Sequence, residues 1–146
     1  MHALRAVFLS TLLLPGASCG GGDDLSPEEE ELVSIINTER SSRGFREVRL
    51  RKDLTCAAAN HVGDIGERKA CSHTGADGSS PGDRVSRCKG SGWSGEIVAC
   101  GHTTPRAAVD GWLGSEGHRE IMLDPDQVSI GVGMHNNYWA AVFDKK

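Results

Sequence analysis

The C-terminal stretch VSIGVGMHNNYWAAVF, residues 128–143, carries the clearest structural signal in this chain. From Val128 to Met134, apolar residues alternate with serine and glycine, which is the period-two pattern of a half-buried β-strand. His-Asn-Asn at 135–137 predicts a turn, because asparagine accepts the backbone conformations of tight turns. Residues 138–143 are apolar and aromatic and predict the returning strand of a β-hairpin.

Two long helices are predicted before this hairpin. The first begins with Ser26 as its N-cap, Pro27 in its first turn and Glu29 in the capping-box position, and it ends near residues 41–44. The second begins at Asp53 and carries one apolar stripe with alanines small enough for close packing against a neighbour. The stripe consists of Leu54, Ala57, Ala58, His61 and Ile65.

Shorter elements fill the middle of the chain. A helix is predicted from Ser80-Pro81 to Cys88, a strand over 96–100, a helix from Thr104-Pro105 and a helical turn over 118–123. Helices that precede and follow the strands in this way predict an α/β protein. We expect a three-layer α/β/α sandwich with a small central antiparallel sheet.

Size and charge restrict the class of protein. The chain has 146 residues, and its 16 basic against 20 acidic residues leave a net charge of −4. This balance argues against a nucleic-acid partner. No apolar run reaches the roughly 20 residues that cross a bilayer. We therefore expect one globular, monomeric domain.

The N-terminus has the composition of an export signal. Arg5 precedes the apolar run 6–14, and small residues follow, so residues 1–18 are predicted to be a signal peptide. Cys19 and a flexible Gly/Asp-rich tether over 19–27 then resemble a bacterial lipoprotein signal, in which the cysteine is lipidated. Gly16 stands where such signals usually have leucine, so ordinary secretion is the alternative. A lipid on Cys19 would be the only membrane contact.

Four further cysteines support an extracytoplasmic location. They are Cys56, Cys71, Cys88 and Cys100. An even number in a small exported domain predicts two disulfides. Three pairings are possible, and we expect the local one, Cys56–Cys71 with Cys88–Cys100. A four-cysteine zinc site is a weak alternative, because no CxxC pair occurs.

Eight short motifs occur in an order that resembles one family. They are residues 37–40 (Asn-Thr-Glu-Arg), 54–61, 72–74 (Ser-His-Thr), Arg84, 95–96 (Gly-Glu), Trp112 with 115–119, 130–133, and 138–139 with Phe143. In these motifs the chain is similar to the CAP superfamily, also called SCP/TAPS or PR-1-like, in its short bacterial form. The resemblance assigns residues 28–146 to a CAP domain. It implies an α/β/α sandwich with a surface cavity of histidines and acids, which binds a divalent metal in several relatives.

The resemblance also implies which residues line that cavity. Carried across position by position, it selects His73, Glu96 and His118 as the metal or cavity residues. The second acid of the family falls at Ser115, where short bacterial members often have serine. The neighbouring Glu116 is a substitute only if the backbone turns it inward.

Two isoleucines depart from the family pattern. Ile97 and Ile121 stand where the family usually has asparagine. The replacement is neutral if the two amides paired with each other. If the amides oriented the site, the cavity is partly decayed.

These residues allow a functional and a structural interpretation. Two neutral imidazoles and a carboxylate suit Zn²⁺ or another borderline divalent metal and leave a position open for water, which a metal can activate as a nucleophile. The structural alternatives are a loop role for His73, a capping or packing role for His118, and an ion pair of Glu96 with Arg84. His61, on the packed stripe, is predicted to be a satisfied core histidine. No ligand role is expected for His102 or His135.

Three functions remain, in this order. The first is an exported, membrane-tethered binding module for a small molecule, a lipid or another envelope component, or a divalent metal. The lack of a complete catalytic set favours it over the second, a metal-dependent hydrolase of the envelope. The third is a stress or interaction protein with a vestigial site, which the two isoleucines favour.

Overall fold

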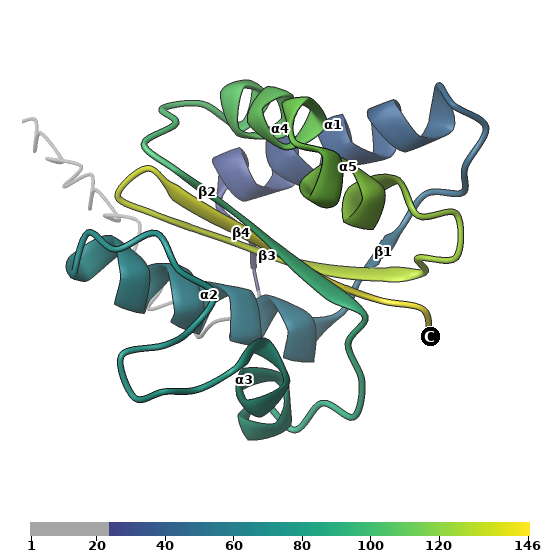
Figure 1. Ribbon diagram of the computed structural model, residues 1–146. Coiled ribbons are helices and arrows are strands. Elements are labelled where there is room, and N and C mark those ends of the chain that lie inside the picture. The colour runs from purple at the N-terminus through teal and green to yellow at the C-terminus, as the bar shows by residue number, and fades with distance from the viewer. Residues whose placement is uncertain (1–23) are drawn as a thin grey trace, which may run out of the picture.

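The computed structural model describes residues 24–146, so the predicted signal peptide and Cys19 lie outside the described residues. Within this range five helices and four strands follow one another (Figure 1). The helices are α1 (Pro27–Ser41), α2 (Lys52–Glu67), α3 (Pro81–Arg87), α4 (Pro105–Gly114) and α5 (Glu116–Leu123). The strands are β1 (Arg49–Leu50), β2 (Gly95–Cys100), β3 (Ser129–His135) and β4 (Tyr138–Asp144).

One sheet separates two layers of helices. Its strands are ordered β1-β3-β4-β2, which leaves β2 at one edge. Helices α2 and α3 cover one face, and α1, α4 and α5 cover the other (Figure 1). The three-layer α/β/α sandwich expected from the sequence is therefore confirmed. None of the helices within residues 24–146 is long and apolar enough to span a membrane.

The predicted hairpin forms the centre of the sheet. Strands β3 and β4 pair antiparallel, and the last pair joins His135 to Tyr138. Asn136 and Asn137 connect them with φ angles of 51° and 65°. Two successive residues with positive φ form the type I′ turn that matches the twist of a hairpin.

The opposite edge of the sheet differs from the prediction. Strand β1 has two residues and pairs parallel to β3, Arg49 beside Ser129. Two residues are too few for a period-two pattern, so the sequence did not reveal this strand. The antiparallel arrangement is confirmed for the three longer strands, and the sheet as a whole is mixed.

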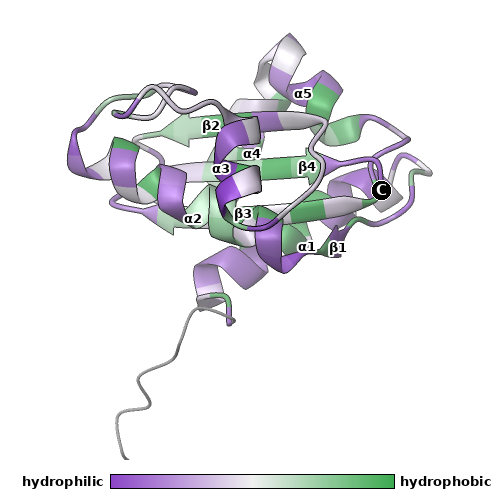
Figure 2. Ribbon diagram, turned by 90° about the horizontal axis from the view of Figure 1, so that it is seen from below, coloured by the Kyte–Doolittle hydropathy of each residue, from purple (hydrophilic) through white to green (hydrophobic). Residues whose placement is uncertain are grey.

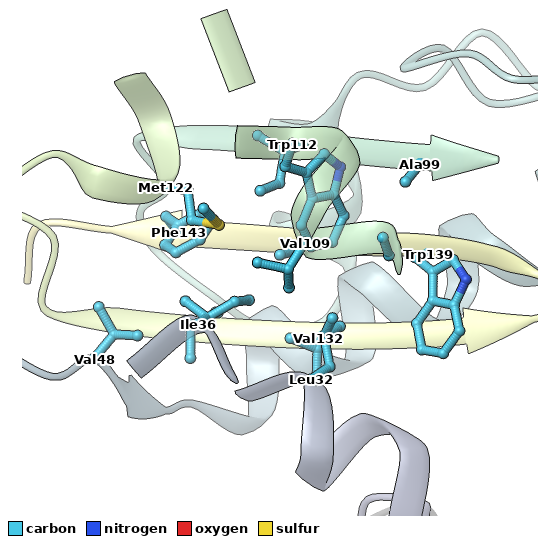
Figure 3. Close-up of a cluster of buried hydrophobic side chains, with 14 residues drawn as sticks. Leu32, Ile36, Val48, Ala99, Val109, Trp112, Met122, Val132, Trp139 and Phe143 are labelled. Atoms are coloured by element: carbon cyan, nitrogen blue, oxygen red, sulfur yellow. The ribbon is translucent and has the colours of Figure 1, made fainter. Parts of the chain in front are cut away.

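Two apolar clusters fill the space between the layers. The larger one lies beneath α1, α4 and α5 and contains Trp112, Trp139 and Phe143 (Figure 3). The smaller one lies beneath α2 and α3 and contains Leu54 and Ile65 of the predicted stripe. Figure 2 shows the hydrophobic colour concentrated on the strands, with hydrophilic residues on the outer helix turns. This separation is what burial of one helix face against a sheet requires.

Helix α2 approaches the sheet more closely than side chains would allow. A Cβ atom on Gly131 of β3 would lie 2.0 Å from the backbone carbonyl carbon of Leu54. Glycine on the strand and alanines on the helix together make this contact possible, as the small residues of the stripe predict.

The disulfides correct the expected pairing. Cys56 is bonded to Cys88, and Cys71 to Cys100, with sequence separations of 32 and 29. The local pairing fails because Cys56 lies in the second turn of α2, whereas Cys71 follows the end of that helix. At 1.5 Å per residue, the helix separates them by about 16 Å, beyond the roughly 7 Å that a disulfide spans.

Candidate functional site

A buried carboxylate on the edge strand β2 lies at the centre of the candidate site. Side chains alternate along a strand, so Glu96 faces α2 and α3 together with Val98, while Ile97 joins the core on the other face. Glu96 is only 5% exposed. A buried carboxylate is costly unless it is paired and hydrogen-bonded, and both of its oxygens are.

Arginine and histidine share this carboxylate. Arg84 donates from Nη2 to Oε2 of Glu96 at 2.7 Å. The Nδ1 atom of His73 lies 2.9 Å from Oε1, and the Nε2 atom of His61 lies 3.7 Å from the same oxygen. The Glu96–Arg84 pair, which the sequence offered as the structural role of Glu96, is therefore present.

Arg84 connects three segments of the chain. Ser80 and Asp83 form a capping box that starts α3 and places Arg84 one turn into it. The guanidinium also donates to the carbonyl oxygens of Ser79, at 2.9 Å, and His73, at 3.0 Å. Its planar set of donors suits this arrangement, because one group can bind a carboxylate and carbonyls at once. The loop before α3 is thereby fixed to β2.

The same loop presents His73 at the surface. The Cys71–Cys100 disulfide anchors the loop to the end of β2. The side chain of His73 is 52% exposed. Its contact with the Glu96 carboxylate requires a hydrogen on Nδ1, so a neutral ring carries its free lone pair on Nε2. A carboxylate that fixes the tautomer in this way is the usual support of a metal-binding histidine.

His118 approaches from the other helix layer. It lies in α5 and is partly buried. Burial lowers its pKa below the usual value, and the charge of His73 lowers it further. His73 and His118 thus come from the two helix layers on either side of the sheet. A lowered pKa keeps the His118 imidazole neutral at pH 7, as ligand binding requires.

The candidates for a fourth position make no hydrogen bond or ion pair with this group within residues 24–146. Ser115 lies between α4 and α5, where its backbone N–H donates to the carbonyl of Trp112. Glu116 is exposed in the first turn of α5. Among the hydrogen bonds and ion pairs of residues 24–146, none joins either side chain to His73, Glu96 or His118.

Both departing isoleucines have joined the larger core. Ile97 is fully buried, and Ile121 packs against the same cluster. Ile121 also covers Gly95, where a Cβ atom would lie 2.7 Å from its Cγ2 atom. Because both asparagines of the family pattern are replaced by isoleucine, no buried amide is left without a hydrogen-bond partner. This fits the interpretation that the double replacement is neutral for stability.

The donor set fits a metal only in part. No group of three or more His, Cys, Asp or Glu side chains in residues 24–146 is arranged to hold a metal ion. Glu96, implied as a ligand by the family resemblance, is engaged by Arg84 and His73. The groups that remain for a cation are the two imidazoles, with Glu96 as the carboxylate behind His73 rather than as a ligand.

The other histidines make different contacts, and only His61 borders the Glu96 carboxylate. His61 is fully buried and its Nε2 lies 2.7 Å from the carbonyl of Ser72, but its Nδ1 has no partner in the described part of the chain. The expectation of a satisfied core histidine is thus correct for one ring nitrogen only. The ring of His135 contacts Glu67 at 2.6 Å, and His102 accepts from Trp139 through its backbone carbonyl.

Comparison with known proteins identifies the family. The model of the CAP family, the cysteine-rich secretory protein family, matches residues 33–143. The chain therefore belongs to the CAP family.

Individual relatives support this assignment. YkwD of Bacillus subtilis is 32% identical over 113 residues, which are 75% of this chain and 43% of YkwD. An extracellular SCP-domain protein of Bacillus anthracis superimposes with a TM-score of 0.77 at 27% identity, over 85% of this chain and 45% of its own. An outer surface protein of Borrelia burgdorferi shares the fold, with a TM-score of 0.72 at 23% identity, over 85% of this chain and 96% of its own. The chain spans less than half the length of the curated relatives that it matches.

Proposed function

We propose that this CAP-domain chain is an extracytoplasmic binding module that holds a borderline divalent cation, such as Zn²⁺, between His73 and His118. Two imidazoles leave coordination positions open, which water or the donor atoms of a small ligand can complete. The role of the domain is then to hold such a ligand rather than to transform it.

The state of Glu96 carries this proposal. The carboxylate orients His73 through Nδ1, so that Nε2 keeps its lone pair on a half-exposed ring and is available to a cation shared with His118. An orienting carboxylate of this kind raises the basicity of the imidazole and sets its direction.

The same observation weakens the hydrolase alternative. A general base needs a carboxylate or imidazole that can accept a proton from the attacking water. Glu96 already accepts from Arg84 and His73 and is 5% exposed, so burial shields it from an attacking water.

An extracytoplasmic location fits the chemistry of the chain. Two disulfides form in oxidising compartments. The Bacillus anthracis relative is described as extracellular. We further propose that residues 1–18 are removed and that Cys19 carries the lipid anchor. Replacement of Cys19 by serine should then move the protein from the membrane fraction to the soluble fraction.

Titration calorimetry with Zn²⁺ on the oxidised protein tests the binding site. We expect saturable binding near one equivalent that is lost in His73→Ala and in His118→Ala. His135→Ala is the matched control, because it removes an exposed histidine that also contacts a glutamate. Binding that persists in both site variants, or that disappears equally in the control, would contradict the proposal.

A further inference from the structure

A hollow with a basic rim lies at the β1 edge of the sheet, where the chain passes from the end of α1 into β1 (Figure 1). Its volume is about 380 Å³, toward the lower end of pockets that hold small molecules. The backbone N–H of Arg49 donates to the carbonyl of Val128 at 2.9 Å, which fixes β1 to the chain that leads into β3. The lining residues are Arg46, Glu47, Val48, Arg49 and Val128. Neither His73 nor His118 is among them, so the hollow is separate from the candidate cation site.

The two arginines of this lining have no acidic partner. Arg46 and Arg49 are exposed, and within residues 24–146 neither guanidinium makes an ion pair or a hydrogen bond. Arg43, at the end of α1, differs from them because it is paired with Glu39 at 2.6 Å. Glu47 is the one acid among the lining residues. Two arginines against one glutamate leave the lining with one excess positive charge.

A further positive charge is buried next to this lining. Arg40 is fully buried, and among residues 24–146 its guanidinium donates only to backbone carbonyl oxygens. The contact of its Nε with the carbonyl of Arg46 places the charge beside the backbone of a lining residue. The acceptors are the carbonyls of Arg46 at 2.9 Å, Met122 at 2.7 Å, Asp124 at 3.0 Å and Gln127 at 3.4 Å.

Carbonyl dipoles solvate the Arg40 charge without cancelling it. Arginine keeps its proton in proteins, and salt screens a buried charge less than an exposed one. Burial lowers the pKa of Arg40, the Asp124 carboxylate raises it, and the charge of Arg46 lowers it again. Because Asp124 is itself paired with Lys145 at 2.8 Å, it offsets Arg40 only in part. The positive potential at the hollow is therefore larger than the exposed arginines alone would create.

A phosphate group matches this arrangement. Guanidinium groups bind phosphate oxygens through planar pairs of N–H donors. A phosphate monoester carries a charge of about −1.5 to −2 at pH 7, more than a carboxylate can supply to several cations. The hollow also has room for the organic part of a small ester.

We propose that the hollow lined by Arg46 and Arg49 is a second binding site, which takes the phosphate group of a small phosphate monoester. Glu47 limits the affinity of this site, because its carboxylate repels the phosphate. The site shares no residue with the His73 and His118 pair and does not depend on a cation there. The phosphate can belong to a soluble ester or to a lipid headgroup, and the experiment distinguishes these two sources.

Nuclear magnetic resonance titration with glycerol 3-phosphate tests this proposal. We expect saturable shifts, in the millimolar range, of the Glu47, Val48 and Val128 backbone amides. Glycerol is the matched probe, because it keeps the carbon skeleton and lacks the phosphate, and it should cause no saturable shift. For the lipid source, Cys19→Ser protein is mixed with phosphatidylcholine vesicles that contain or lack phosphatidic acid, and sedimentation measures the bound fraction.

Charge variants separate this site from a general electrostatic effect. Arg46→Gln and Arg49→Gln should each weaken binding about fivefold, the upper end for an exposed charge pair. Arg43→Gln is the matched control, because it removes an exposed arginine outside the lining, and it should change binding less than about twofold. Glu47→Gln should strengthen binding, a gain that damage to the fold cannot produce. Its one hydrogen bond, from the Ser41 hydroxyl, is exposed and 3.4 Å long.

Each outcome decides for or against the site. Saturable glycerol 3-phosphate shifts that weaken in both lining variants, persist in Arg43→Gln and increase in affinity in Glu47→Gln support it. Binding confined to phosphatidic acid vesicles and lost in both lining variants also supports it and assigns the phosphate to a lipid headgroup. Absence of both kinds of binding, equal shifts with glycerol, or equal weakening in Arg43→Gln overturns it. His73→Ala should leave phosphate binding unchanged, so this proposal and the Zn²⁺ proposal can fail separately.

Discussion

Loss of the Arg84 guanidinium should destabilise the fold strongly, because it isolates a buried charge. In Arg84→Met the side chain of Glu96 remains, and that side chain is only 1% exposed. Breaking a buried ion pair by removal of one partner costs about 3–5 kcal/mol. The carbonyls of Ser79 and His73 also lose their donor. We therefore expect the free energy of unfolding at pH 7 to fall by about 4 kcal/mol in urea denaturation of the oxidised protein.

Removal of both charges should be less damaging than removal of one. In the double variant Arg84→Met/Glu96→Leu, no unpaired charge remains, and well-packed apolar replacement of a buried pair is often neutral. The two carbonyls still lose their donor, at about 1–3 kcal/mol for a buried group. The double variant should therefore be more stable than Arg84→Met by about 2 kcal/mol.

The matched control lies on the same helix. Arg87→Met removes an arginine whose pair with Asp77 is exposed on both sides, and solvent screens such pairs. It should change stability only slightly. A loss in Arg84→Met no larger than that in Arg87→Met, or a double variant less stable than the single one, would refute this account of Glu96.

Three further predictions concern the fold. Gly131→Ala should lower the free energy of unfolding by about 3 kcal/mol, because its Cβ would meet the α2 backbone at 2.0 Å. Gly63→Ala should raise it by about 0.5–1 kcal/mol, because a Cβ atom there has open space around it. Thermal denaturation of the two variants measures both effects. Replacement of Cys71 and Cys100 by alanine should cost about 3.5 kcal/mol for a loop of this length and also weaken Zn²⁺ binding, which urea denaturation and calorimetry measure. Burial lowers the pKa of His61 in the folded state, so the unfolded chain takes up a proton first as the pH falls below about 6.5. The free energy of unfolding should therefore decrease below that pH. In His61→Gln this decrease with falling pH should be smaller.

The sequence correctly predicts the helices and strands that are long enough to show a hydrophobic period. The hairpin and α2 are long enough for a period to appear, and both lie where expected. Strand β1, with two residues, shows no period and depends on the β3 edge beside it. The sequence contained the information to reject the local disulfide pairing, because the predicted helix from Asp53 already places Cys56 and Cys71 too far apart.

The candidate site is also predicted only in part. Family motifs indicate His73, Glu96 and His118, and the ion pair of Glu96 with Arg84 was foreseen as a structural role. The sequence does not predict that Glu96 binds Arg84 through one oxygen and His73 through the other, because the conformation of the loop before α3 decides this. Within residues 24–146, Nδ1 of His61 has no hydrogen-bond partner, whereas Nε2 of the same ring contacts the carbonyl of Ser72, and no sequence pattern predicts either fact.

The tautomer of His73 tests the central claim most directly. Side-chain ¹⁵N spectra of the histidines, recorded at neutral pH before and after addition of Zn²⁺, report which ring nitrogen carries the hydrogen and which binds metal. We expect His73 to carry its hydrogen on Nδ1 and to bind Zn²⁺ through Nε2, with His118 responding in parallel and His135 unchanged. A hydrogen on Nε2 of His73, or a response confined to His135 and His102, would contradict the account.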